Sequence, residues 1–271
     1  MNRSSSQEQG KPSGPRKSQA DKDSAQLRQR DLDILRLIGE QTAYRFDQLQ
    51  TLLARHPDTR AKDPTFLSQS QTYTLIRRWK RLDLVTSRKI YHDEPGWISL
   101  TQRGLALVGI SARSLVPLYA QLNHLFWVNE TRALVQERYG SRPGFQWESQ
   151  REYQYFKTQQ TQEPDESIPL EYQSLHHPDA VLRYRLEEDP EAPEIVSAIE
   201  IELYQKEYPT WKKIFVDLTR FFDCAHYYID PVLKPSLEKA LEQFQNEEHS
   251  FGNPEREQRP YIHIHDLEQR L

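Results

Sequence analysis

The sequence is poor in the residues that mark several familiar protein classes. Its 271 residues include one cysteine, Cys224, and nine glycines. A single cysteine excludes an internal disulfide framework and is typical of a protein kept in a reducing compartment. No apolar run approaches the roughly 20 residues of a membrane-spanning helix, and the first residues lack the apolar core of a signal peptide. We therefore expect a cytoplasmic protein with no membrane partner.

Motifs of several enzyme classes are also absent from the sequence. The few glycines form no phosphate-binding loop, and there is no C-x-x-C pair and no G-x-S-x-G nucleophile elbow. Aromatic residues are plentiful, with 14 Tyr, 10 Phe and 5 Trp, so a substantial core can form. The length suits one large domain or two ordinary ones.

The net charge of −4 hides an asymmetry between the two halves of the chain. Residues 1–110 hold 19 Lys and Arg against 12 Asp and Glu, a net charge of +7. The remaining residues hold 17 against 28, a net charge of −11. This division favours two domains with different partners, and only the basic half has the charge to attract nucleic acid.

The hydrophobic pattern of the basic half predicts three helices followed by two short strands. Residues 1–24 are polar and are predicted to be a disordered tail. Apolar residues at helical spacing predict helices near 27–38, 46–53 and 68–82, and strands are expected at 84–91 and 96–100. This order is typical of a winged helix, here over residues 25–110, in which the third helix enters the major groove of DNA.

The predicted third helix and the ribbon after it carry a polar and basic surface suited to duplex DNA. Arg and Lys neutralise phosphates, and Ser, Gln and Arg can also read base edges. The alternative is an ordinary solvated helix face. The candidate DNA-binding residues are Ser70, Gln71, Thr74, Arg77, Arg78, Arg81, Arg88 and Lys89.

A linker at 111–121 leads to a second predicted domain over residues 122–271, which opens with a helix at 122–139. His124 and Asn129 on this helix are assigned to packing. Two strands follow, in "HPDAVLRYRL" and "IVSAIEIEL", with a turn between them at 187–193. Later segments predict a helix at 207–224, a strand at 226–230, a helix from about 235 and a last strand at 260–267.

Acidic residues are concentrated in this predicted hairpin, although Asp and Glu are poor strand formers. Alternation places Glu200 and Glu202 on one face, roughly 7 Å apart, and Asp179 begins the partner strand. Such oxygen-rich clusters suit Mg²⁺ or Mn²⁺, which would activate water at a phosphodiester while Lys206 stabilises charge. The alternative is a solvated strand edge whose carboxylates face water.

These residues resemble a known arrangement. "HPD" followed by "EIE" and a nearby lysine resembles the PD-(D/E)XK restriction-endonuclease-like fold. With "LTQRG" at 100–104 and "NHLFWVNETRALV" at 123–135, the chain resembles the replication-relaxation family of bacterial and mobile-element proteins. The resemblance implies a mixed α+β or α/β chain, a winged helix followed by a nuclease-like domain with a mixed central sheet.

The resemblance also implies residue roles. Asp179 and Glu200 match the two metal-binding acids, Glu202 stands where the motif has its lysine, and Lys206 would replace that lysine from the following helix. The implied function is a DNA-binding protein of a plasmid or mobile element with a metal-dependent endonuclease-like domain. The alternative is a non-catalytic regulator whose second domain serves dimerisation or docking to other replication proteins.

Overall fold

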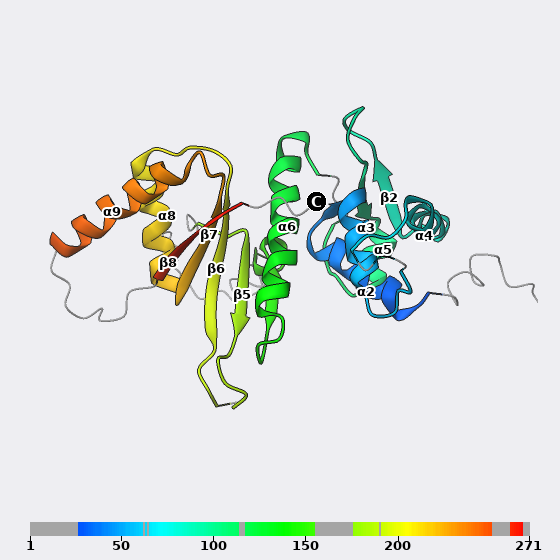
Figure 1. Cartoon of the computed structure of the whole chain (residues 1–271), viewed down its shortest axis with the longest axis horizontal. Coiled ribbons are helices and arrows are strands. Elements are labelled where there is room, and N and C mark those ends of the chain that lie inside the picture. The colour runs from blue at the N-terminus through cyan, green and yellow to red at the C-terminus, as the bar shows by residue number, and fades with distance from the viewer. Residues whose placement is uncertain are drawn as a thin grey trace, which may run out of the picture.

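The computed structural model describes residues 27–61, 63, 65–113, 117–154, 176–189, 191–250 and 261–267. It is a mixed α+β chain with one small and one larger sheet. Figure 1 shows the larger sheet between the helices α8 and α9 on one side and the long helix α6 on the other. The elements of the first half lie beyond α6. The predicted tail at 1–24 falls outside the described residues.

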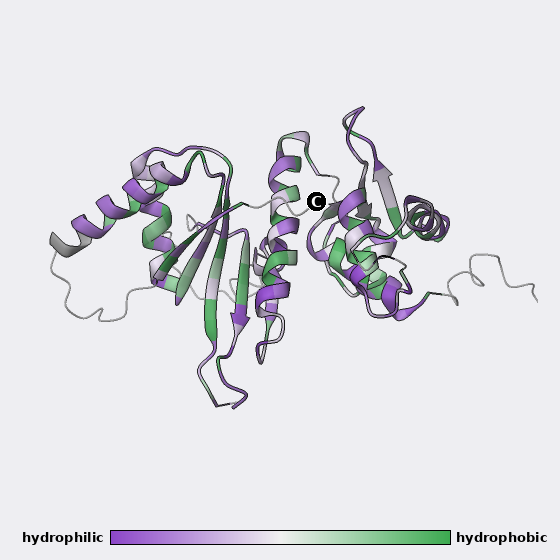
Figure 2. Ribbon diagram, viewed as in Figure 1, coloured by the Kyte–Doolittle hydropathy of each residue, from purple (hydrophilic) through white to green (hydrophobic). Residues whose placement is uncertain are grey.

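Over its described residues, the first half consists of four helices and a three-stranded antiparallel sheet in the order β1-β3-β2. Hydrophobic residues from all of these elements form one core, which includes Ile34, Leu49 and Trp79. Figure 2 shows α4 mostly in the colours of hydrophilic residues. The elements are α2 (Gln29–Glu40), β1 (Ala43–Arg45), α3 (Phe46–Arg55), α4 (Gln69–Arg81), β2 (Val85–Arg88), β3 (Trp97–Leu100) and α5 (Gln102–Leu107).

The glycine of "LTQRG" has a structural role at the start of α5. Thr101 caps this helix, and its hydroxyl accepts a hydrogen bond from the backbone N–H of Gly104 at 3.0 Å. A Cβ atom at Gly104 would collide with the backbone carbonyl of Leu84. Glycine therefore lets α5 pack directly against the chain that leads into β2.

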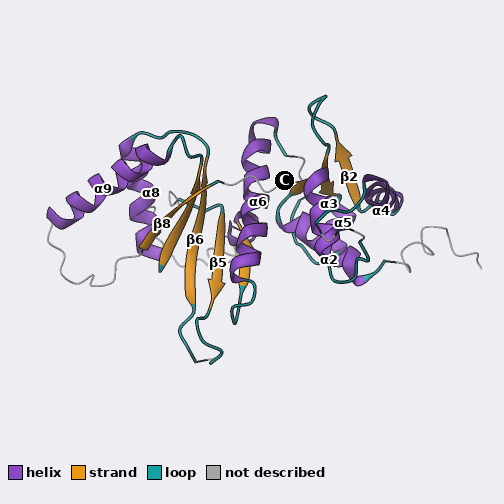
Figure 3. Cartoon of the chain, viewed as in Figure 1, coloured by secondary structure: helices purple, strands orange, loops and turns teal. Residues whose placement is uncertain are grey.

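The second half is built on a five-stranded sheet in the order β4-β5-β6-β7-β8. The pairs β4–β5 and β5–β6 are antiparallel, whereas the pairs β6–β7 and β7–β8 are parallel. Figure 3 shows helices on both faces of this sheet. The elements are η1 (Tyr119–Gln121), α6 (Leu122–Tyr139), β4 (Gln146–Ser149), β5 (Ala180–Tyr184), β6 (Ile195–Glu202), α8 (Tyr208–Phe221), β7 (Cys224–Ile229), α9 (Lys234–Ser250) and β8 (Tyr261–Asp266).

Both faces of the central strand β6 are buried. Ile199 and Ile201 pack in the core beneath α6, whereas Ala198 packs in the core beneath α8 and α9. The alternation expected from the sequence is therefore present, but the side that carries Glu200 and Glu202 is enclosed as well. A strand with neighbours on both sides is not a sheet edge, so the solvated-edge alternative is wrong.

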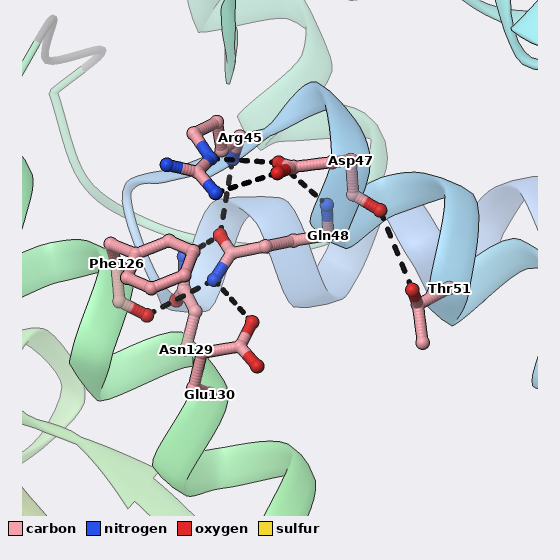
Figure 4. A network of polar contacts seen from close by, with 7 residues as sticks. All are labelled: Arg45, Asp47, Gln48, Thr51, Phe126, Asn129 and Glu130. Carbon is pink, nitrogen blue, oxygen red and sulfur yellow. Dashed lines mark hydrogen bonds and ion pairs between the residues drawn. The ribbon is translucent and has the colours of Figure 1, made fainter. Parts of the chain in front are cut away.

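Helix α6 also packs against the first half of the chain. Leu122 and Phe126 share a core with Ala43 and Trp97. Polar side chains continue this contact (Figure 4): the Gln48 amide donates to the carbonyl of Phe126 at 3.0 Å and to Glu130 at 2.7 Å. The two halves are thus joined by an apolar and hydrogen-bonded interface.

The packing assigned to Asn129 from the sequence is confirmed. Its side chain is 2% exposed, and its amide donates to the carbonyl of Ala43 at 3.0 Å and to Gln48 at 3.2 Å. Nearby, Arg132 forms an ion pair with Glu40 at 2.6 Å. Together with Phe126 and Glu130, Asn129 and Arg132 therefore hold the first half against α6 through polar contacts.

Candidate functional site

The surface of α4 carries most of the predicted DNA-binding residues. Ser68 caps the helix, and its hydroxyl accepts from the backbone N–H of Gln71 at 3.4 Å. Trp79 and Ile76 anchor the opposite side of the helix in the core. Seven of the eight predicted residues are exposed, namely Ser70, Gln71, Thr74, Arg77, Arg81, Arg88 and Lys89.

Arg78 does not belong to this exposed surface, which corrects the prediction. Its guanidinium forms an ion pair with the fully buried carboxylate of Asp31, and Arg30 contacts the same carboxylate at 3.3 Å. Arg78 is one residue beyond Arg77, about 100° further around the helix, and this rotation points it at α2. It stabilises the contact between α2 and α4.

Lys80 is a surface cation that the sequence reasoning missed. It lines a shallow hollow together with Thr74, Arg77 and Arg81. Four exposed cations have no ion-pair partner among the described residues, namely Arg77, Lys80, Arg88 and Lys89. Unpaired cations on one surface are available to neutralise an external polyanion.

The acidic cluster, defined here as Asp179, Glu200 and Glu202, lies where β5 begins and β6 ends. Glu200 and Glu202 are 2% and 3% exposed, respectively. Asp179 precedes β5, and one of its oxygens accepts from the backbone N–H of Ile201 at 2.8 Å. The order of the strands therefore brings the three predicted acids together, as expected from the sequence.

Each acid of the cluster has a basic partner. The Nε2 atom of His176 lies 2.7 Å from Glu200, and the Nε2 atom of His124 lies 3.1 Å from Asp179. Lys206 forms an ion pair with Glu202, and its ammonium also lies 4.7 Å from the ring centre of Trp211. Three acids thus face three bases in a largely enclosed site.

Burial and mutual contacts shift the pKa values of the cluster. Burial raises the pKa of Glu200 to about 7 against the hydrogen bond from His176, and the charge of Asp179 adds to the rise. Burial also raises the pKa of Glu202, although Lys206 opposes it. Burial acts to lower the pKa of both histidines, but the acids that they contact raise both values above normal. Protons are therefore held more tightly here than in water.

The sequence reasoning missed the two histidines. It gave His124 no catalytic role, whereas the structure places this side chain against Asp179. His176 stands three residues before Asp179 in "HHPD", which is the signal that could have marked it. The position of His124 on α6, 55 residues before Asp179, carries no comparable local signal.

The cluster does not present a preformed metal site. Within the ranges that the structure describes, no group of three or more His, Cys, Asp or Glu side chains could hold a metal ion. One oxygen of each of two acids contacts a histidine: Oδ2 of Asp179 lies against His124, and Oε1 of Glu200 lies against His176. Binding of Mg²⁺ or Mn²⁺ through these two oxygens would require both contacts to open.

A cleft of about 630 Å³, open to solvent, adjoins the cluster between the two halves of the chain. Asp179 and His124 line it from the second half, and Glu40 and Thr42 line it from the first. Arg151 also lines this cleft, and its guanidinium donates to the carbonyl of Gly39 at 2.9 Å. The acidic cluster is therefore reached from the junction between the halves.

Comparisons with known proteins do not place the chain in a family. No family model matches the sequence, and no curated protein and no solved structure is significantly similar to it. The replication-relaxation resemblance therefore stays a prediction. In the part of the chain that the structure describes, no helix has the length and hydrophobicity to cross a membrane.

Proposed function

We propose that the chain is a double-stranded-DNA-binding protein in which α4 enters the major groove and the β2–β3 ribbon contacts the flanking backbone. The observation that carries the proposal is the row of exposed polar and basic side chains on α4, opposite the side anchored by Trp79. The element order α2-β1-α3-α4-β2-β3 and the sheet order β1-β3-β2 support a winged helix.

The decisive test reverses two exposed cations, Arg77→Glu with Lys80→Glu. Loss of about two phosphate contacts should reduce the slope of log K against log[salt] by about 2 and weaken duplex binding at least about tenfold. The matched control is Lys239→Glu, an exposed lysine on α9. Unchanged affinity in a gel-shift titration at moderate salt would refute the assignment of α4.

Arg78→Glu is a second, contrasting variant. Because Arg78 pairs with the buried Asp31, its reversal should lower the melting temperature, whereas Arg77→Glu should leave it nearly unchanged. The two neighbouring arginines thus separate loss of DNA binding from loss of folding.

For the second half, we propose a non-catalytic role in which the acidic cluster holds α6 and the segment before β5 against β6. The support is that each acid already has a basic partner: His124 for Asp179, His176 for Glu200 and Lys206 for Glu202. In this role the protein is a regulator of a plasmid or other mobile element, as the family resemblance implies. Dimerisation and docking to other replication proteins are its expected activities.

A metal-dependent endonuclease is the second candidate. The observation that favours it is the meeting of Asp179, Glu200 and Glu202 at one end of two adjacent strands, beside an open cleft. Millimolar Mn²⁺ separates the candidates. A non-catalytic cluster predicts no change in melting temperature and no nicking of supercoiled plasmid. A rise in melting temperature that Asp179→Asn abolishes, together with nicking, would establish the endonuclease instead.

If the melting temperature rises but no nick forms, Glu202 is the residue to change. It stands at the strand position where the resembling fold carries lysine. Glu202→Lys would then be expected to restore cleavage, and nicking by this variant alone would identify a metal-binding but degenerate nuclease.

A further inference from the structure

Three tyrosines from separate parts of the chain lie near one another at the junction between the halves. Tyr91 belongs to the loop between β2 and β3, Tyr119 to η1, and Tyr204 to the segment after β6. The rings of Tyr91 and Tyr119 are 4.8 Å apart, with an interplanar angle of 47°. We call these three residues the tyrosine ledge.

The electrostatic environment of Tyr91 places Tyr204 in the same neighbourhood. The pKa of Tyr91 is raised to about 12, chiefly by its hydrogen bond with Tyr119 and then by loss of solvent. The charges of Glu94 and Tyr204 contribute to the same rise. Tyr119 and Tyr204 therefore both lie close enough to Tyr91 to influence it.

The ledge is anchored at one end and open at the other. Tyr91 is partly buried against the core formed by Ala43, Trp97 and α6. Tyr119 and Tyr204 are 62% and 65% exposed, which is unusual for side chains of this size. Two large aromatic side chains thus face solvent beside a partly buried one.

The position of the ledge connects the two functional surfaces. Figure 1 shows the β2–β3 loop, the start of α6 and the end of β6 at the same edge of the molecule. The exposed cations Arg88 and Lys89 lie three and two residues before Tyr91, and Tyr204 follows Glu202 of the acidic cluster by two residues. A strand that leaves a duplex bound at the ribbon would meet the ledge next.

We propose that the tyrosine ledge stacks against unpaired bases of a DNA strand that emerges from the duplex held by α4 and the ribbon. Exposed aromatic rings beside a basic surface are the usual platform for single-stranded nucleic acid, because every base has a face that can stack. This proposal rests on the proposed DNA-binding function and extends it. The preferred ligand is a junction between duplex and single strand.

The experiment compares a blunt duplex with the same duplex carrying a single-stranded tail of about ten nucleotides, using the full chain. The tailed duplex should bind about 5- to 100-fold more tightly, the range that a base–aromatic stack contributes. Tyr119→Ala with Tyr204→Ala should remove this advantage and leave blunt-duplex affinity unchanged. Tyr119→Phe with Tyr204→Phe should keep it, because the rings remain.

Two further variants keep the result unambiguous. Tyr261→Ala removes a 76% exposed tyrosine from β8 and should have no effect on either DNA. Tyr204→Ala alone changes a side chain outside every described core and should still lower the tail advantage. A 2-aminopurine in the tail should be quenched by the wild type and by the phenylalanine variant, but not by the double alanine variant.

Equal affinity of the wild type for tailed and blunt duplexes would overturn the ledge while leaving the duplex proposal intact. The ledge would also be overturned if Arg77→Glu weakened binding to blunt and tailed duplexes equally while the double alanine variant weakened neither. If neither DNA binds, the proposed function itself fails. If the alanine variant instead abolishes self-association in light scattering, the ledge is an interface between copies of this chain, and the stacking proposal is wrong.

Discussion

The pair formed by Glu200 and His176 makes the stability of this protein depend on pH in a defined direction. Glu200 is 2% exposed, and its pKa is raised from 4.5 to about 7. Each pKa unit corresponds to about 1.4 kcal/mol, so an ionised Glu200 destabilises the folded state by about 3 kcal/mol.

The direction of this pH dependence follows from the number of protons bound in the folded and the unfolded chain. Between about pH 4.5 and 7 the folded chain keeps a proton on Glu200 that the unfolded chain has lost, so the free energy of unfolding falls as pH rises. The pKa of His176 is also raised. His176 stabilises the folded chain fully when the pH is below its pKa in the unfolded chain, near 6.5. This stabilisation is lost as the pH rises through its higher pKa in the folded chain. Both groups therefore weaken the fold toward alkaline pH.

Glu200→Gln should remove most of this dependence, because the amide is neutral at every pH and is nearly the same size as the acid. The free energy of unfolding of the variant, relative to wild type, should rise by about 3 kcal/mol between pH 5 and pH 8. Urea unfolding at four pH values measures it, with the exposed Glu238→Gln as control. If the difference in free energy of unfolding between Glu200→Gln and wild type stays constant with pH, the reasoning is refuted.

Three further variants test the packing. Asp31→Asn leaves the guanidinium of Arg78 without its buried partner and should lower the free energy of unfolding by about 3 kcal/mol in urea. Gly104→Ala places a methyl group against a backbone carbonyl and should lower the free energy of unfolding by about 1–3 kcal/mol in urea. Alanine at Gln48 and at Asn129, singly and together, should show a coupling of about 1 kcal/mol in a double-mutant cycle, and strict additivity would argue against the interface network.

Local pattern predicted the regular elements well. The helix expected at 122–139 matches α6 at both ends, and the alternation in "IVSAIEIE" matches β6. Strand β1 was missed, because three residues carry no periodic pattern. It forms through pairing with β3, in which Ala43 lies opposite Ser99, and that partner is far away in the sequence.

Exposure was harder to predict than the elements themselves. Tyr73 lies three residues before Ile76, at the spacing of one helix face, yet it is 46% exposed and its ring centre lies 4.5 Å from that of Phe46. Arg78 was expected on the DNA-facing surface, yet it pairs with Asp31. Both outcomes depend on which neighbouring helix approaches which side of α4, and the sequence of α4 alone does not contain that information.

The sequence by itself determined that Glu200 and Glu202 lie in one strand and that Asp179 lies beside the start of its partner strand, because alternation and turn residues act over a few positions. Only the tertiary structure decided what surrounds them. Burial of β6 between two helical layers encloses the acids, and the chain brings His124 from α6 and His176 from the segment before β5 to meet them. Contacts between residues so distant in sequence follow from how whole elements pack, since hydrophobic burial selects the packing without regard to local pattern.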